Sequence, residues 1–304
     1  MSRDLVLEIG CEEVPARLMP DTLAQLKALA EDRFQALRLS FAEMGTTGTP
    51  RRLVLVVRNL AEETTPHEYE VKGPPAKAAY DADNRPTRAA EGFAKNQGVE
   101  LSALTVRTIE GGEYVFAIKR EQGRPAQQVL TEVLPALVRG LAFPRPMRWG
   151  SRELKFVRPI KWLLALFGSE VIPFELAGIR SDRCTFGHRF LAPGPFTVSD
   201  VAGYFDCLKN AYVMLSPQER RNVIRAQGED LAKAANGRVL WPEDLLTEVT
   251  FLVEYPTALM GSFAPEYLAL PSDVIVTPMK DHQRYFPVVN QEGELLPHFI
   301  AVRN

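Results

Sequence analysis

The decapeptide MKDHQRYFPV, residues 279–288, carries the most varied chemistry of any short stretch in the chain. Its cations, Lys280, His282 and Arg284, can neutralise phosphate, and the aromatic rings that follow them can stack on a nucleic-acid base. The stretch is therefore compatible with an active site, with an RNA-binding strand, or with a strand whose alternate side chains face water.

A catalytic role for His282 lacks its usual partners in the local sequence. Asp281 is adjacent, but an Asp–His pair without a neighbouring nucleophile is weak evidence for catalysis. In an extended strand, side chains alternate between the two faces, which would place His282, Arg284 and Phe286 together. This arrangement favours a binding strand over a catalytic centre.

The densest basic stretch, FPRPMRWGSRELKFVRPIKW, occupies residues 143–162. Only Glu153 opposes its cations, and aromatic residues such as Trp149 lie between them. Cations that neutralise phosphate and planar groups that stack on bases are what RNA binding requires. The alternative is that the aromatic rings face a core and the cations face water. The cations are Arg145, Arg148, Arg152, Lys155, Arg158 and Lys161.

The hexapeptide TFGHRF, residues 185–190, raises a similar question. His188 and Arg189 follow Gly187 and are suited to a phosphate-binding nest or to an interface. A glycine at a strand bend with two solvated cations explains the pattern equally well.

The helix expected at 216–236 carries Arg220, Arg221 and Arg225 in its first two turns. Positive charge at a helix amino terminus opposes the helix dipole. A partner surface would compensate for this, and so would Glu219 or solvent.

Established catalytic motifs are missing from the sequence. It contains no Walker A loop, no dinucleotide-binding glycine motif, no H-E-x-x-H and no G-x-S-x-G, and its four histidines are dispersed. The pair Glu12-Glu13 lies near an expected helix start, where the dipole favours negative charge, so we interpret it as solvated rather than catalytic. We therefore expect no catalytic and no metal-binding residues in this chain.

The first hundred residues predict a strand at 4–9, a helix at 21–43 and a strand at 50–57. Residues 61–100 contain GPP, NRP and QGV among many charged residues, which indicates a surface excursion with a short helix at 87–97. A hairpin with Gly111-Gly112 at its turn should follow, and then a helix at 125–139 that Pro135 would kink or end early.

The rest of the chain predicts strands at 162–167 and 171–176, helices at 199–209, 216–236 and 242–250, and strands at 283–289 and 298–302. The helix at 216–236 has the clearest start, because Ser216 and Glu219 form a capping box around Pro217. Irregularly mixed strands and helices indicate an α+β class in several lobes rather than a doubly wound sheet. We expect a first region at 1–194 and a second at 195–304.

The composition limits the function classes. A chain of 304 residues with a formal charge of -2 is long enough for about two domains, and any affinity for phosphate must come from local clusters. Three widely spaced cysteines suit a reducing compartment. With no signal-peptide pattern at the amino terminus and no long apolar run, we expect a cytoplasmic protein.

Several long blocks together resemble one family. They are LVLEIGCEEVPA (5–16), TPRRL (49–53), VKGPPAKAAYDADNRPTRAAEGFAKNQG (71–98), FPRPMRWG (143–150), FVRPIKWLLALFG (156–168), GHRF (187–190), ERR (219–221), LVEYPTALMGSF (252–263), MKDHQRYFPV (279–288) and HFIAVRN (298–304). In this order they resemble the beta subunit of the bacterial two-subunit glycyl-tRNA synthetase. Members of that family are longer, with HD-like and anticodon-binding regions beyond the HFIAVRN block, so the resemblance covers an amino-terminal part.

The resemblance implies a division of labour between two chains. The family's alpha subunit carries the class II core that activates glycine with ATP and magnesium, and the beta subunit supports aminoacylation and tRNA recognition in a two-alpha, two-beta tetramer. This chain would then need no cofactor of its own. Its candidates for contact with tRNA(Gly) or the alpha subunit are Arg145, Arg148, Trp149, Arg152, Lys155, Arg158, Lys161, His188, Arg189, Lys280, His282 and Arg284.

Two other functions remain open from the sequence. A stand-alone hydrolase or editing domain would use His188 or His282 and should place a carboxylate or thiol within hydrogen-bond reach of that ring. An assembly scaffold without RNA contact should instead tie the cations at 145–161 into internal salt bridges or a protein interface.

Overall fold

The computed structural model describes residues 2–81, 83–109, 111–150 and 153–304, which form two compact units. One unit contains the chain up to Glu62 and again from Gln127 to Asn304, and the other contains Glu63–Ala126. Strands and helices are mixed in both units, which confirms the predicted α+β class. The boundary expected between 194 and 195 stays a prediction.

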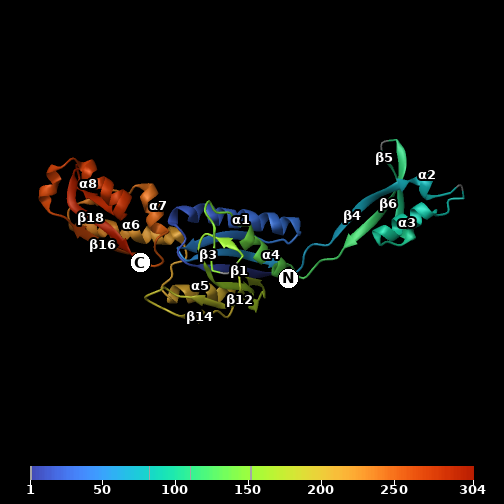
Figure 1. The fold of residues 1–304 in the computed structure, drawn as a ribbon, viewed down its shortest axis with the longest axis horizontal. Coiled ribbons are helices and arrows are strands. Elements are labelled where there is room, and N and C mark those ends of the chain that lie inside the picture. The colour runs from blue at the N-terminus through green and yellow to red at the C-terminus, as the bar shows by residue number, and fades with distance from the viewer. Residues whose placement is uncertain (1, 82, 110, 151–152) are drawn as a thin grey trace. The chain divides into compact units, whose positions relative to one another are not determined.

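The larger unit is built on a seven-stranded sheet in the order β11-β12-β9-β1-β3-β2, with β10 paired to β9 (Figure 1). Its central strand β1 is buried from Leu5 to Cys11, because it is covered on both faces. The strands are β1 (Ser2–Cys11), β2 (Glu43–Thr49), β3 (Arg52–Ala61), β9 (Ile160–Phe167), β10 (Glu170–Val171), β11 (Glu175–Leu176) and β12 (Ile179–Asp182).

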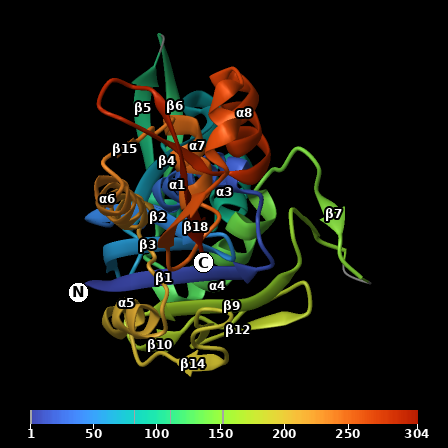
Figure 2. The same ribbon diagram turned by 90° about the vertical axis from the view of Figure 1, so that its left-hand side faces the viewer.

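Helices cover this sheet on both sides (Figures 1 and 2). Helix α1 (Met19–Ala36) packs on β2 and β3. The segment that follows α4 (Ala126–Gly140) is joined to α1 by hydrogen bonds between Gln25 and Ala142. On the other face, α5 (Val201–Asn210) buries Tyr204 and its apolar neighbours against β1, β3 and β9. Helix α4 runs through Pro135, so of the two predicted alternatives, a kink or an early end, the early end is wrong.

The helix predicted at 21–43 is shorter than expected. It ends at Ala36, because Arg38 takes a left-handed φ of 55° and the Leu39 N–H bonds to the Phe34 carbonyl. Residues Glu43–Thr49 then pair with β3 as an edge strand, which the sequence analysis did not predict. The opening is therefore strand, helix and two strands.

The carboxyl-terminal part of the larger unit is a four-stranded sheet in the order β15-β17-β18-β16, with helices α6 and α7 packed against it. The Ser216 hydroxyl accepts a hydrogen bond from the Glu219 N–H at 3.2 Å, which confirms the predicted start of α6. The elements are α6 (Pro217–Ala234), β15 (Arg238–Val239), α7 (Glu243–Thr250), β16 (Thr257–Ser262), α8 (Ser272–Pro278), β17 (Phe286–Val289) and β18 (Leu295–Arg303).

The described secondary structure also includes two short hairpins, three 3₁₀ turns and one π-helical turn, Met279–Gln283. The hairpins pair β7 (Met147–Arg148) with β8 (Lys155–Phe156), and β13 (Cys184–Phe186) with β14 (Pro195–Thr197). The 3₁₀ turns are Ala16–Leu18, Leu101–Ala103 and Pro265–Ala269. In the described part of the chain, no helix has both the length and the apolar character needed to span a lipid bilayer.

The smaller unit contains a three-stranded antiparallel sheet in the order β4-β6-β5, with two helices packed on it. Thr87 caps α3 by accepting the Ala89 N–H, as the expected start of that helix requires. The predicted hairpin is confirmed at β5 and β6, although Glu110 lies outside the described residues. The elements are β4 (His67–Pro75), α2 (Ala76–Ala79), α3 (Arg88–Gln97), β5 (Leu104–Ile109) and β6 (Gly112–Glu121).

A buried ionic network joins the two sheets of the larger unit. Glu254, in the loop between α7 and β16, is fully buried and accepts hydrogen bonds from Arg51 at 2.5 Å and from Arg52 at 2.9 Å. Thr49 donates a third, at 2.6 Å, to the same carboxylate. Burial raises the pKa of Glu254, but the charges of Arg52 and Arg51 outweigh it and lower the value to about 2.

A second buried carboxylate shares Arg52. The Arg52 guanidinium lies 3.7 Å from Glu8, which also accepts hydrogen bonds from Trp162 at 2.5 Å and from Tyr204. Burial, followed by the charge of Glu8, raises the pKa of the Tyr204 phenol well above its ordinary value. Each buried carboxylate in the network therefore meets a guanidinium group and accepts several hydrogen bonds. Charges buried without such partners would destabilise the fold.

We predict that Glu254→Ala lowers the free energy of unfolding by about 3–5 kcal/mol, because it removes the buried carboxylate that pairs with both Arg51 and Arg52 and leaves Arg52 with the more distant Glu8. Urea unfolding at pH 7 measures this. The control is Glu175→Ala, whose partner Arg180 is exposed, and it should leave the urea midpoint nearly unchanged. Equal destabilisation by the two variants would contradict the assignment.

The same carboxylate should make stability depend on pH. The pKa of Glu254 is lowered from 4.5 to about 2 on folding, so its contribution is present above about pH 4.5 and is lost as the pH falls toward 2. In Glu254→Gln, the loss of stability over this acid range should be shallower than in the unmodified chain. Acid unfolding followed by circular dichroism tests this, and parallel curves would contradict it.

Candidate nucleic-acid interface

The hairpin of β7 and β8 carries the basic stretch on an arm that extends away from the large sheet (Figure 2). Met147 pairs with Phe156 and Arg148 with Lys155. The Trp149 indole donates a hydrogen bond to the Phe156 carbonyl at 2.9 Å, which adds a side-chain link between the two sides of the hairpin. Phe156 is buried, so the hairpin is anchored by one aromatic ring while its cations remain outside.

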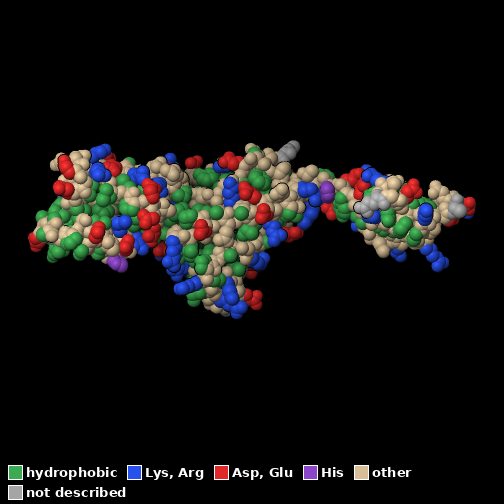
Figure 3. All heavy atoms as spheres, turned by 90° about the horizontal axis from the view of Figure 1, so that it is seen from above, with side chains coloured by type: hydrophobic (Ala, Val, Ile, Leu, Met, Phe, Trp, Pro, Cys, Tyr) green, Lys and Arg blue, Asp and Glu red, His purple; other side chains and the backbone are tan. Residues whose placement is uncertain are grey.

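Three of these cations are free to meet a ligand. Arg145, Arg148 and Lys155 are exposed, and among the residues that the structure describes none of the three forms an ion pair. Lysine and arginine side chains gather on the projection at the lower centre of Figure 3. Arg152 lies outside the described residues. The hairpin region therefore presents three exposed cations, with one exposed carboxylate, Glu153, between its two strands.

The remaining cations of the basic stretch are tied to the acidic pair near α1. Lys161 lies 3.4 Å from Glu12, and Arg158 donates a hydrogen bond to the Glu13 carbonyl at 2.9 Å. Arg189 lies 2.7 Å from Glu12 and 3.6 Å from Glu13. Partial burial raises the pKa of Glu12, but hydrogen bonds from Arg189 and Lys161 outweigh it, so the pKa lies below its usual value.

This pairing separates the predicted cations into two sets. The internal salt bridges expected of an assembly scaffold exist for Lys161 and Arg189 but not for Arg145, Arg148 and Lys155 within the described ranges. The adjacent acids Glu12 and Glu13 thus act as counter-ions. Their partners lie about 150 residues away in sequence, so no local pattern could have identified this role.

His188 is a buried structural residue. Its Nδ1 atom accepts hydrogen bonds from the backbone N–H groups of Phe190 at 3.3 Å and Leu191 at 3.1 Å. The other ring nitrogen, Nε2, therefore carries the hydrogen and donates it to the Asn304 side-chain oxygen at 3.0 Å. In the described part of the chain, no hydrogen bond joins this ring to a carboxylate or thiol, so the criterion for a hydrolase is not met at His188.

The predicted start of the strand at residue 283 is wrong. Residues Met279–Gln283 form a π-helical turn, because Tyr285 N–H bonds to the Met279 carbonyl at 2.8 Å and Arg284 takes a left-handed φ of 60°. Strand β17 begins only at Phe286, which is buried. The predicted shared face of His282, Arg284 and Phe286 therefore does not form.

The charged residues of this turn have different environments. Arg284 forms an ion pair with Glu248 at 3.0 Å and donates to the carbonyls of Lys280 and Asp281, so it stabilises the turn. His282 is exposed and Lys280 is half-buried. Of the three cations, only Lys280 and His282 remain accessible to a partner.

The arginines of α6 do not form a binding surface. Arg220 is fully buried and donates to the carbonyls of Met214, Thr250 and Gly48. Burial lowers its pKa to about 10. Its four-residue spacing from the buried Ile224 places Arg220 on the inner face of the helix.

The other two arginines of this helix meet a carboxylate at the start of α7. Arg221 and Arg225 both form ion pairs with Glu243. Glu243 was not among the sources of compensation that the sequence left open, which were Glu219, solvent and a partner surface. No group of three or more His, Cys, Asp or Glu side chains in the described ranges is arranged to hold a metal ion.

We predict that His188→Ala lowers the free energy of unfolding by about 2–3 kcal/mol, because it removes a buried ring and leaves two backbone donors unpaired. His282→Ala is the matched control, since that ring is exposed. Urea unfolding of both variants tests the difference. If His188→Ala were as stable as the control, the structural role would be wrong.

The comparisons with known proteins agree with each other. The family model described as "Glycyl-tRNA synthetase beta subunit" matches residues 5–304. Curated relatives with the name "Glycine--tRNA ligase beta subunit" include those of Moorella thermoacetica, 56% identical, and Desulforamulus reducens, 53% identical, each over all 304 residues. A third relative, from a Geobacter species, is 45% identical over the same length.

The match covers this chain completely but covers less than half of each relative. All of this chain is aligned with each of these relatives, but it spans only 44% of their length. The matched region includes the large sheet, the hairpin of β7 and β8, and the sheet that contains β17 and β18. The chain belongs to the glycyl-tRNA synthetase beta subunit family.

Proposed function

We propose that this chain supports the ligation of glycine to tRNA(Gly) by holding the tRNA, and that the β7–β8 hairpin is one of its RNA contacts. The observation that carries the proposal is the set of three exposed cations, Arg145, Arg148 and Lys155, which have no ion pair within the described residues. In contrast, Lys161 and Arg189 pair with Glu12, and two arginines of α6 pair with Glu243.

The chemistry of the hairpin matches the phosphate backbone of RNA. Guanidinium groups bind phosphate oxygens in a fork geometry, and each phosphate that is neutralised releases counterions. The Trp149 ring is only half-buried, so part of it can contact a sugar or base. Contacts of this kind position a nucleic acid without selecting its sequence.

Glycine activation with ATP and magnesium is assigned to the companion alpha subunit in this proposal. The chain would act by positioning the tRNA for transfer, since correct placement of a reactant lowers the barrier without any group that touches the reacting atoms. A two-alpha, two-beta tetramer in the cytoplasm, where tRNA is used in translation, is the assembly that we infer.

Arg148→Ala combined with Lys155→Ala should weaken binding of tRNA(Gly). It should also reduce the slope of log K against log salt by about one to two, since about one counterion is released per phosphate contact. Fluorescence anisotropy at several salt concentrations measures both quantities.

A charge-matched control distinguishes a local contact from a change in net charge. Arg180→Ala with Lys233→Ala removes two exposed cations that each lie beside a carboxylate. This control should keep the slope of the unmodified chain. An identical slope in all three proteins would remove the hairpin from the interface.

A second prediction concerns the division of chemistry. The purified chain should give no glycine-dependent exchange of pyrophosphate into ATP, and exchange should require the companion alpha subunit. Radiolabelled pyrophosphate exchange tests this with and without that subunit. Exchange by the chain alone would place adenylate formation here and overturn the assignment.

A further inference from the structure

The three-stranded sheet of the smaller unit has helices on one of its faces. Helices α2 and α3 bury Val115 and Ala117 of β6, with Leu104 of β5, in a small apolar core. Side chains alternate along a strand, so Tyr114 and Phe116 of β6 belong to the opposite face. We call this opposite face of the smaller unit's sheet the second face.

Two aromatic rings at the centre of the second face have cations beside them. Tyr114 and Phe116 are neighbours on one face of β6, which is the central strand. Lys72 of β4 pairs with Phe116, and Arg107 of β5 pairs with Tyr114. Directly paired residues share a face of the sheet. Rings on a sheet surface stack on unpaired bases, and adjacent cations bind the phosphates between those bases.

The Lys72 ammonium group lies over the Tyr114 ring. Its Nζ atom is 3.8 Å from the ring centre, which is a cation–π contact. Lys72 is exposed, and it forms no ion pair within the described part of the chain. Because a cation–π contact at an exposed site is weak, a base can replace the ammonium group on the ring. The released Lys72 can then bind a phosphate of the same strand.

An ion pair crosses the central strand at Phe116. Arg107 of β5 pairs with Glu70 of β4, and β6 lies between these two strands. The register places Glu70 opposite Ile118 and Arg107 opposite Tyr114, on either side of Phe116. The Phe116 ring is buried, whereas 55% of the Arg107 side chain is exposed. Such an exposed pair adds little stability, so Arg107 can exchange Glu70 for a phosphate and uncover the ring.

One polar group on the second face has no partner. The Thr105 hydroxyl oxygen is buried and forms no hydrogen bond with the residues that the structure describes. Thr105 is paired with Phe116, so its hydroxyl group lies on the same face as the covered ring. A buried polar atom without a partner requires a specific explanation. A base edge or a ribose 2′-hydroxyl group that enters when Arg107 moves would supply the missing hydrogen bond.

The charges and rings of the second face favour a nucleic acid over a protein. Its rings lie beneath cations and are not presented as the exposed apolar anchors on which protein interfaces are centred. Its carboxylates, Glu68 and Glu70, already pair with arginines, which leaves the charge of Lys72 in excess. A single strand of RNA offers planar bases to the rings and phosphates to the cations, so it satisfies both.

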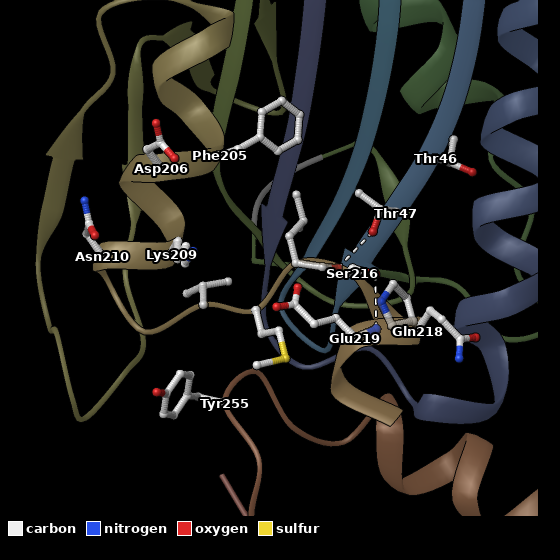
Figure 4. Close-up of a pocket in the computed structure, with 14 residues that line it drawn as sticks. Thr46, Thr47, Phe205, Asp206, Lys209, Asn210, Ser216, Gln218, Glu219 and Tyr255 are labelled. Atoms are coloured by element: carbon white, nitrogen blue, oxygen red, sulfur yellow. Dashed lines mark hydrogen bonds between the residues drawn. The ribbon is translucent and has the colours of Figure 1, made fainter. Parts of the chain in front are cut away.

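A pocket in the larger unit is chemically less selective (Figure 4). It has a volume of about 970 Å³ and is lined by residues of α5 and of the start of α6. Lys209 lines it together with Asp206 and Glu219, so charges of both signs are present. The pocket therefore indicates no single class of ligand, whereas the second face combines aromatic rings with an excess of positive charge.

We propose that the second face of the smaller unit binds single-stranded RNA. One base stacks on Tyr114 in place of Lys72, and a second base stacks on Phe116 after Arg107 has moved to a phosphate. This goes beyond the hairpin contact, because phosphate contacts do not require unpaired bases and stacking does. It is independent of the proposed function, since any unstructured RNA can serve as the ligand.

The test uses the full chain with Arg148→Ala and Lys155→Ala, so that the hairpin contributes little. In this background, Tyr114→Ala should weaken binding of a short labelled oligouridine about tenfold, since one ring–base stack has an effect of this order. Tyr114→Phe keeps the ring and should bind like the background chain. An RNA duplex of similar length, which presents no free bases, should bind all three proteins equally. Fluorescence anisotropy at low salt measures each affinity.

The matched control is Tyr69→Ala, which removes the same side chain from the helix-bearing face, since Tyr69 pairs with Lys119. It should keep the affinity for oligouridine. The proposal is overturned if Tyr114→Ala binds oligouridine as tightly as Tyr114→Phe does. Failure of the background chain to bind oligouridine at low salt also overturns it, and so does equal weakening by Tyr69→Ala.

Lys72→Gln tests the same face without removing a ring. Lys72 is exposed, so this variant should fold like the unmodified chain. In the background chain it should reduce the slope of log K against log salt for oligouridine by about 0.7, the value for one phosphate of a single strand. An unchanged slope would contradict the role of Lys72.

One further outcome would replace RNA by protein. If sedimentation shows that the unmodified chain self-associates, and Tyr114→Ala abolishes the association without changing oligouridine binding, then the second face is a protein interface and the proposal fails. The hairpin contact is tested separately by tRNA(Gly) binding, so its failure and the failure of this inference can be distinguished.

Discussion

The larger unit depends on one buried carboxylate. Glu254 comes from the loop before β16, and the guanidinium groups that compensate it come from the β2–β3 turn and the start of β3. Because neither sign of charge can be buried alone, the two sheets must be placed so that these groups meet. The same loop supplies the Glu254 and Tyr255 N–H groups that bind the Asn304 side-chain oxygen.

Compensation of charge also divides the surface cations of the larger unit into two groups. Cations that meet Glu12, Glu13, Glu243 or Glu248 stabilise the fold and offer little to an anionic ligand. The cations of the β7–β8 hairpin have no such partner in the described residues and are available for phosphate. A formal charge of -2 for the chain is compatible with RNA binding only because the charge is distributed in this way.

Helix starts and tight turns could be predicted from the sequence, because neighbouring residues determine them. The Ser216 cap and the glycine turn before β6 are examples, since neighbouring residues determine both. Strand β2 was missed because its sequence, EMGTTGT, is held by pairing with β3 rather than by its own propensity. The free cations of the candidate interface were harder to predict, because the exposure and ion pairing of each cation depend on residues that are distant in sequence. A lone Glu8 inside the apolar run LVLEIG was a usable indication of a buried partner, but nothing local identifies Arg52 as that partner.

The central claim is that this part of a synthetase subunit contacts tRNA. The most direct measurement is binding of the unmodified chain to tRNA(Gly) and to an unrelated tRNA, by anisotropy over a range of salt concentrations. The account predicts binding at low salt that weakens steeply as salt is raised, since exposed cations carry it. An absence of binding to either tRNA at low salt would contradict it and leave the chain as a body that docks protein alone.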